Sequence, residues 1–186
     1  EVLADLQLNP LPLAPVGSLL GTSMAGTLSV NGKINGPIPA LNANLSIGVV
    51  NPQFSGIRLQ EEWRGKFVGL VGGGGNLQMD SVGAALPGSI TAQIARDWSL
   101  ADLMIRRLGG RISVKSTPDR YQWEAEGFRL DRVEVAIPPE KRFKRLFGEL
   151  GGQGSFGIRP LFIDGQIGLR YSRLMGLKLK EAQFKG

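Results

Sequence analysis

The stretch Leu-Asn-Ala-Asn-Leu-Ser-Ile-Gly-Val at positions 41–49 decides the fold class of this chain of 186 residues. Every odd position in it is apolar, and every even position is Asn, Ser or Gly. Successive side chains of a β-strand point to opposite sides, so this period of two places the apolar side chains on one face. The stretch therefore predicts a strand of an antiparallel sheet that is dry on one side and wet on the other.

The same alternation returns along most of the chain, and it predicts a mostly β, antiparallel-rich protein. It recurs at 2–8, 28–34, 77–79, 90–94, 112–114, 121–125, 133–137 and 163–169. Pro, Gly and Asn pairs separate these stretches and predict turns at Asn31-Gly32, Asn35–Pro37, Asn51-Pro52, Pro87-Gly88 and Thr117–Asp119. Asp164-Gly165 lies inside an alternation, so it predicts either a turn or a bulge.

Two segments depart from this pattern and predict one or two short helices. In Ser99–Arg107 the apolar residues fall three and four positions apart, and Gly109-Gly110 supplies a stop. In Pro139–Leu150 the apolar spacing is similar, and the densest basic run of the chain, Lys141–Arg145, lies within it. This second helix would either cap one end of the sheet or lie on a membrane surface.

Composition excludes much chemistry. The chain has no His and no Cys, which removes Ser-His-Asp and Cys-His nucleophiles, thiolate or imidazole metal sites and disulfides. We therefore expect no enzyme activity, no catalytic residues, no metal and no cofactor. The first 93 residues carry 4 basic and 5 acidic side chains, and the remaining 93 carry 18 and 11. We interpret the basic half as a solubilising surface, or as a face that binds anionic lipid or an acidic protein. Because its basic residues are not interleaved with stacking aromatic residues, we expect no nucleic-acid partner.

Three further features have an ordinary structural interpretation. Gly72–Gly75 lacks the Gly-Lys-Ser/Thr ending and the helix of a phosphate-binding loop, so it predicts a turn. Glu61 and Glu62 are adjacent and would point to opposite faces of a strand, which does not suit an acid–base pair. Trp63, Trp98 and Trp123 suit a core or sheet-edge role better than a ligand site.

An internal repeat is the most informative feature beyond the alternation. Gly56–Glu61, GIRLQE, matches Gly176–Glu181, GLKLKE, and each copy ends in an aromatic residue, a basic residue and Gly. The repeat extends over about 39–65 and 160–186. We interpret residues 1–186 as a single fragment of a longer repetitive β array, to which each unit adds strands.

The apolar face of such an array must be covered, because large exposed apolar patches are rare. A second sheet or closure into a barrel would cover it, whereas a curled open sheet would leave a long dry groove. The dry positions are mainly aliphatic and lack fixed polar groups, which suits an acyl chain better than a shaped small molecule. The expected groove-lining residues are Leu28, Val30, Leu41, Ala43, Leu45, Ile47, Val49, Ile90, Ile94, Ile112, Val114, Ile163, Ile167 and Leu169.

The motif GIRLQEEWRG at Gly56–Gly65, together with GTLSVNGKINGP at Gly26–Pro37, resembles recurring elements of the TamB family, the translocation and assembly module subunit. The likeness is to the photosynthetic branch, which includes a chloroplast envelope translocon component. It implies an AsmA-like protein anchored in the inner membrane, located in the periplasm and cell envelope, whose repeats form an elongated, curled, U-shaped hydrophobic groove, the β-taco. The family has no catalytic residues.

Two functions follow from this resemblance. One is phospholipid transport between inner and outer membranes and outer-membrane biogenesis, with acyl chains shielded in the groove. The alternative is a scaffold or chaperone that adds strands to outer-membrane proteins during insertion and docks an Omp85-class barrel partner.

Overall fold

The described part of the protein is almost entirely β. The computed structural model describes residues 2–19, 23–38, 40–83, 88–137, 142–158, 161–174 and 177–185. The strands are β1 (Val2–Pro12), β2 (Met24–Gly36), β3 (Asn42–Phe54), β4 (Ile57–Leu59), β5 (Glu62–Leu70), β6 (Gly75–Val82), β7 (Gly88–Ile94), β8 (Leu100–Arg107), β9 (Gly110–Ser116), β10 (Tyr121–Arg129), β11 (Val133–Ile137), β12 (Arg142–Arg145), β13 (Glu149–Ile158), β14 (Leu161–Leu174) and β15 (Leu177–Lys185). A six-residue helix, α1 (Ala14–Leu19), connects β1 to β2.

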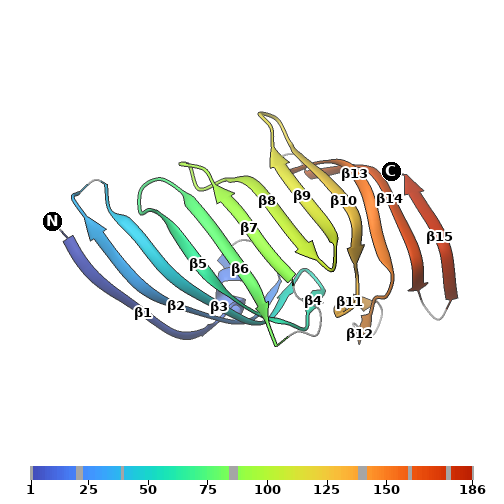
Figure 1. Ribbon diagram of the computed structural model, residues 1–186, viewed down its shortest axis with the longest axis horizontal. Helices are drawn as coiled ribbons and strands as arrows, with labels where there is room; N and C mark the ends of the chain where they lie inside the picture. The colour runs from blue at the N-terminus through green and yellow to red at the C-terminus, as the bar shows by residue number, and fades with distance from the viewer. Residues whose placement is uncertain are drawn as a thin grey trace.

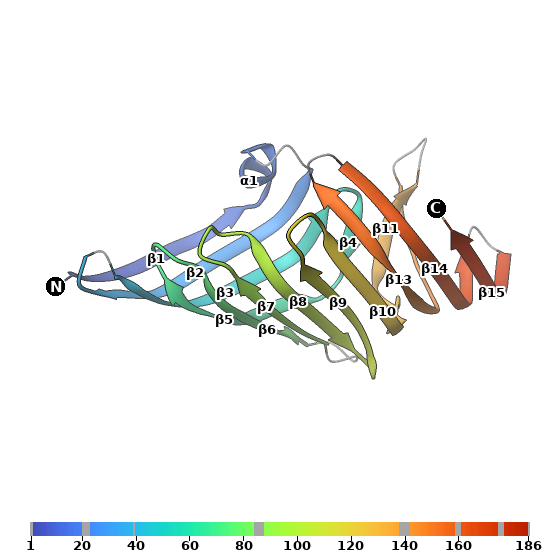
Figure 2. The same cartoon turned by 90° about the horizontal axis from the view of Figure 1, so that it is seen from above.

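These strands form one antiparallel sheet. Twelve of them follow one another in chain order from β1 through β3, β5 through β10, and β13 through β15. The sheet is curled into a half-barrel, and the views from the front and from above show it wrapping around its long axis (Figures 1 and 2). The expectation of a curled antiparallel sheet is therefore confirmed.

The remaining strands, β4, β11 and β12, form a side branch, which we call the three-stranded branch. One edge of β3 pairs with β5 over Asn42–Val49 and with β4 over Gln53–Phe54, so the sheet forks there. β4 then pairs with β11, and β11 with β12. Because β11 follows β10 after only three residues, the branch links β3 to β10 at one end of the half-barrel.

Both predicted helices are wrong. Ser99–Arg107 contains β8, and its helical spacing has another cause: a bulge near Ala101 brings Leu100 opposite Ile94, while Leu103 pairs with Ala92. Leu100 and Leu103 thus share a face although they are three residues apart.

In Pro139–Leu150 the residues 138–141 lie outside the described ones, and the rest forms β12 and the start of β13. The apolar residues of this segment contact different elements rather than forming one stripe. Phe143 lies under the guanidinium of Arg58 at 3.8 Å, while Leu150 pairs with Phe128 and Leu169. The helix found among the described residues, α1, lies where no helix was predicted.

Three of the predicted turns are continuous strand. Asn31-Gly32 lies within β2, Asn51-Pro52 within β3 and Asp164-Gly165 within β14. Gly165 faces Gly154 in an unbroken register, so there is neither a turn nor a bulge at that point. The turns at Asn35–Pro37 and Thr117–Asp119 are where the sequence predicts them, whereas Pro87 lies outside the described residues.

Two groups of four strands, β1–β4 and β10 with β13–β15, repeat the same pairing. β1, β2 and β3 are in register through Leu8, Val30 and Ile47, and β10, β13 and β14 through Ala125, Gly152 and Ile167. The groups then form matching hairpins: Phe54 pairs with Ile57, and Leu174 with Leu177, 120 positions later.

Local backbone details follow the same repeat. Asn51 and Tyr171 both have φ of 50°. The amides of Leu13 and Leu130 donate to the carbonyls of Gly26 and Gly148 at 2.9 and 3.0 Å. In the first group α1 follows Leu13, and in the second the hairpin β11–β12 follows Leu130. Two strands of the three-stranded branch, β11 and β12, are therefore an insertion into the second group, whereas β4 belongs to the first.

Candidate functional site

An apolar row crosses the whole sheet, and we call it the apolar ladder. Its members are consecutive register partners on the twelve main strands. They are Leu8, Val30, Ile47, Gly65, Met79, Ile90, Ile105, Ile112, Ala125, Gly152, Ile167 and Phe184. Every member is apolar or Gly, and at a strand spacing of about 4.8 Å the row is roughly 50 Å long along the curve of the sheet.

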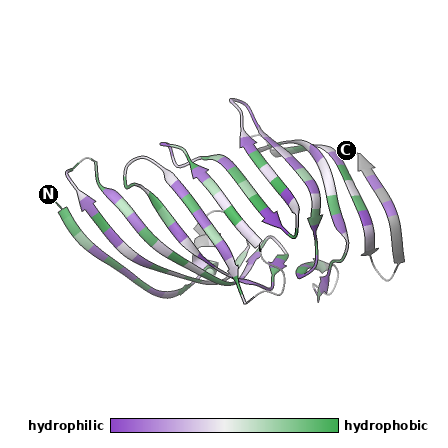
Figure 3. Cartoon of the chain, viewed as in Figure 1, coloured by the Kyte–Doolittle hydropathy of each residue, from purple (hydrophilic) through white to green (hydrophobic). Residues whose placement is uncertain are grey.

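The next row along the strands belongs to the other face and is polar at eleven of its twelve positions. This polar ladder consists of Gln7, Asn31, Ser46, Lys66, Gln78, Thr91, Met104, Ser113, Glu124, Gln153, Gln166 and Lys185. The resulting bands along each strand are visible in the hydropathy colouring (Figure 3). One face of the main sheet is thus apolar and the opposite face polar, from β1 to β15.

The residues predicted to line a groove lie on the same face as the apolar ladder wherever they belong to a paired strand. Five of them belong to the ladder itself: Val30, Ile47, Ile90, Ile112 and Ile167. Seven others are register partners in neighbouring rows: Leu28, Ala43, Leu45, Val49, Ile94, Val114 and Leu169. Ile163 pairs with Phe156, and Leu41 directly precedes β3.

Burial along this face is graded. Val30, Ala43 and Val114 are buried, and most of the other predicted residues are half-buried. Ile163, near the C-terminal end of the sheet, is 74% exposed. The face is therefore protected along the middle of the half-barrel and open toward its last strands.

Sequence reasoning missed several members of the same face. Leu77 and Met79 continue it on β6, and Leu103 and Ile105 continue it on β8. The β8 pair was lost because its segment was predicted to be helical. The alternation of Leu103 and Ile105 with Asp102 and Arg106 was the signal that could have found it.

Aromatic rings cover glycines on this face. A Cβ added to Gly69 or Gly75 would lie 2.8 or 2.7 Å from Cζ of Phe67, and one added to Gly154 would lie 2.9 Å from Nε1 of Trp123. Trp63 is buried, and Trp98 stacks on Phe67 with ring centroids 6.3 Å apart. Trp63 and Trp123 thus lie on strands within the sheet, and Trp98 lies in the turn between β7 and β8.

A buried ion pair closes one end of the same face. Arg107 lies between Gly88 and Gly110, and its Nη2 donates to Oε1 of Glu61. Burial lowers the pKa of Arg107, while the charges of Glu61 and Asp131 oppose that shift. Glu62, the neighbour of Glu61, instead accepts a hydrogen bond from Arg64 at 2.7 Å, so the two adjacent carboxylates are used separately.

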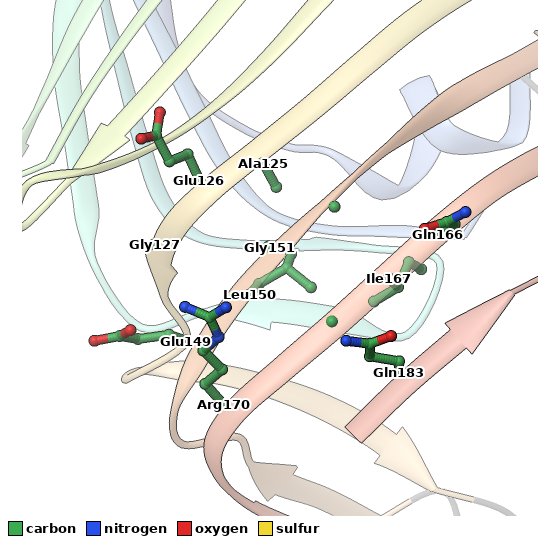
Figure 4. Close-up of a pocket in the computed structure, with 12 residues that line it drawn as sticks. Ala125, Glu126, Gly127, Glu149, Leu150, Gly151, Gln166, Ile167, Arg170 and Gln183 are labelled. Atoms are coloured by element: carbon green, nitrogen blue, oxygen red, sulfur yellow. The ribbon is translucent and has the colours of Figure 1, made fainter. Parts of the chain in front are cut away.

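A cavity of about 550 Å³ lies where β10, β13 and β14 meet. Gly151, Gly152 and Gly168 leave it open, and Glu126, Glu149 and Arg170 are at its rim (Figure 4). Each rim charge has a partner: Glu126 pairs with Arg111, Glu149 with Arg129 and Arg170 with Glu181. Because its rim charges are already paired, this cavity indicates a particular ligand less clearly than the apolar ladder does.

Among the described residues, no group of acidic side chains is placed to hold a metal ion. Within the same part of the chain, no helix is long and apolar enough to cross a bilayer. Gly72 and Gly73 form part of a turn between β5 and β6, as the sequence predicts.

Comparison with known proteins identifies no relative: no protein family, curated protein or solved structure matches this chain.

Proposed function

We propose that this chain is a segment of a TamB-like envelope protein and that its curled sheet forms a U-shaped groove that shields the acyl chains of phospholipids. In this proposal lipid moves along the apolar ladder between inner and outer membranes, and head groups stay in water at the open side. The full-length protein would be anchored in the inner membrane and would work with an Omp85-class barrel. The resemblance of Gly56–Gly65 and Gly26–Pro37 to TamB repeats supports these assignments.

The single observation that carries the proposal is the contrast between the two ladders. Twelve consecutive strands present only apolar residues or Gly in one row, while the adjacent row on the other face is polar at every position except Met104. An acyl chain on the apolar face gains about 25 cal/mol for each Å² of apolar surface removed from water. No bond needs to be made or broken, so the proposed mechanism is desolvation alone.

Lipid content of the purified chain tests this proposal. Leu45 lies on the apolar face and is half-buried, and Ser46 beside it is exposed on the polar face. Leu45→Asp places a charge against the lipid, whereas Ser46→Asp makes the same addition in water and serves as the matched control. Mass spectrometry of extracted lipid should show phospholipid in the wild type and in Ser46→Asp, and strong depletion in Leu45→Asp. Equal lipid content in the folded variants would refute the proposal.

A second candidate function rests on the edge of β1. Within the described residues β1 pairs only with β2, so its other edge is free to accept a strand, and most of its residues are exposed. The sheet would then act as a scaffold that adds strands to nascent outer-membrane proteins. Crosslinkers at Gln7 and Asn9 should capture a client strand if this is its role, and Gln7→Pro should reduce the capture at Asn9.

A further inference from the structure

The three-stranded branch carries a second apolar row, separate from the apolar ladder. Phe54 of β3 pairs with Ile57 of β4, Ile57 pairs with Val135 of β11, and Val135 pairs with Lys144 of β12. Directly paired residues lie on the same face of a sheet. Three apolar side chains and one cation are thus aligned across the four strands.

This face passes from the interior to the surface. On one side of the row, Leu59 pairs with Val133, which is only 7% exposed. Within the row, Ile57 and Phe54 are 47% and 54% exposed. On the far side Ile137 pairs with Arg142. The face therefore becomes more exposed and more basic with distance from the core.

Among the described residues of the branch, the acidic side chain is that of Glu134, which lies on the opposite face and interacts there with three neighbours. Glu134 pairs in register with Arg58 and Arg145, and it accepts a hydrogen bond from Nε2 of Gln60 at 2.6 Å. Nη1 of Arg58 is 3.5 Å and Nε of Arg145 is 3.8 Å from the same carboxylate. Among the described branch residues, the face with Phe54 and Ile57 carries cations but no carboxylate.

We propose that this face of the branch docks on the surface of an anionic phospholipid bilayer. Phe54 and Ile57 would enter the boundary between head groups and acyl chains, and Lys144 and Arg142 would contact lipid phosphates. An acidic protein surface would complement the two cations but would leave Phe54 and Ile57 without an apolar environment. The inference goes beyond the proposed function, because it concerns a surface that the apolar ladder does not include.

Vesicle flotation with the full chain tests the inference. Vesicles of phosphatidylcholine alone are compared with vesicles in which phosphatidylglycerol replaces part of it. We expect binding only to the anionic vesicles, weakened by added salt. Arg142→Ala/Lys144→Ala should reduce that binding about 25-fold, since each cation near an anionic membrane contributes about fivefold. Ile57→Ser should reduce it as well, without a change of charge.

The matched control is Lys66→Ala/Lys115→Ala, which removes the same charge from exposed positions on the polar face of the main sheet. It should retain nearly all of the binding. Equal losses of binding in the two double variants would mean that net charge alone attracts the chain to the vesicles, and this would overturn the inference. Absence of binding to both kinds of vesicle would overturn it as well. Lipid depletion in Leu45→Asp tests the apolar face of the main sheet independently, so failure of one surface is distinguishable from failure of the other.

Discussion

Glu61 and Arg107 are 46 positions apart in the chain and form an ion pair with 1% and 4% of their side chains exposed. The pair joins the linker between β4 and β5 to the end of β8, next to the three-stranded branch. Within the described residues Oε2 of Glu61 and Nε of Arg107 have no hydrogen-bond partner. Removal of the charge of either residue would leave the charge of its partner buried and uncompensated.

Removal of either member of this pair should therefore destabilise the protein strongly. We expect Arg107→Met and Glu61→Leu each to lower the free energy of unfolding by about 3–5 kcal/mol. The double variant should recover most of the loss, because it leaves no charge behind. Urea denaturation of the four proteins checks this, and additive losses in the double variant would contradict it.

Asp131 should make stability depend on pH in the acid range. Burial alone would raise the pKa of Asp131, but the hydrogen bond from Arg129 at 2.9 Å and the charges of Arg129 and Arg107 outweigh burial and lower it. A lowered carboxyl pKa stabilises the fold above the usual value of 3.8, and the stabilisation is lost as pH falls through the folded-state pKa. Asp131→Asn should thus be less stable than the wild type at neutral pH.

The difference between Asp131→Asn and the wild type should shrink below pH 3.8. Chemical denaturation at a series of pH values provides the measurement. A difference that stays constant down to the acid end of the series would show that Asp131 does not interact with Arg129 as the structure indicates.

Glycines on the apolar face should resist substitution more than glycines on the polar face. A Cβ on Gly75 would lie 2.7 Å from both Cζ of Phe67 and Cα of Gly69, whereas one on Gly168 would meet nothing nearer than 3.7 Å. We expect Gly75→Ala to cost about 1–3 kcal/mol through overpacking. Gly168→Ala should be neutral or stabilising, because Ala loses less backbone entropy than Gly on folding. Thermal melts of both variants would show the contrast, and equal effects would contradict it.

Glu134 should control the attachment of the three-stranded branch. β4 and β11 share only three register pairs, and Glu134 holds Gln60, Arg58 and Arg145 around them. Glu134→Ala should speed hydrogen exchange at the amide of Ala136, which donates to the carbonyl of Gly56 at 2.8 Å. Amides of β6 and β7 should exchange at the wild-type rate, and an increase there would mean that the branch supports the whole sheet.

Much of the main sheet follows from the sequence. The alternation at 41–49 predicts β3 and its dry face, and the same rule identifies the dry faces of β2, β7, β9 and β14. Such predictions succeed because each residue's side of the sheet depends only on its parity. The register also brings the distant predicted residues, such as Val30 and Ile167, into one row.

The failures have local causes. The bulge near Ala101, together with Met104 on the polar face, gives β8 the spacing of a helix. The branch was unpredictable because β11 pairs with β4, which is more than 70 positions away, through only three register pairs. The sequence match covered 39–65 and 160–186, although Asn51 and Tyr171 within it share a backbone conformation and no side-chain chemistry. It did not reach β1, β2, β10 and β13, which complete the longer structural repeat.

Photocrosslinking tests the central claim most directly. A phospholipid with a photoreactive group in its acyl chain is bound to the chain and activated, and the labelled residues are mapped by mass spectrometry. Label should concentrate on the apolar ladder, including Ile47 and Ile167, and should be absent from their polar neighbours Ser46 and Gln166. Label distributed equally between the two ladders, or confined to the three-stranded branch, would contradict a lipid path along the apolar face of the sheet.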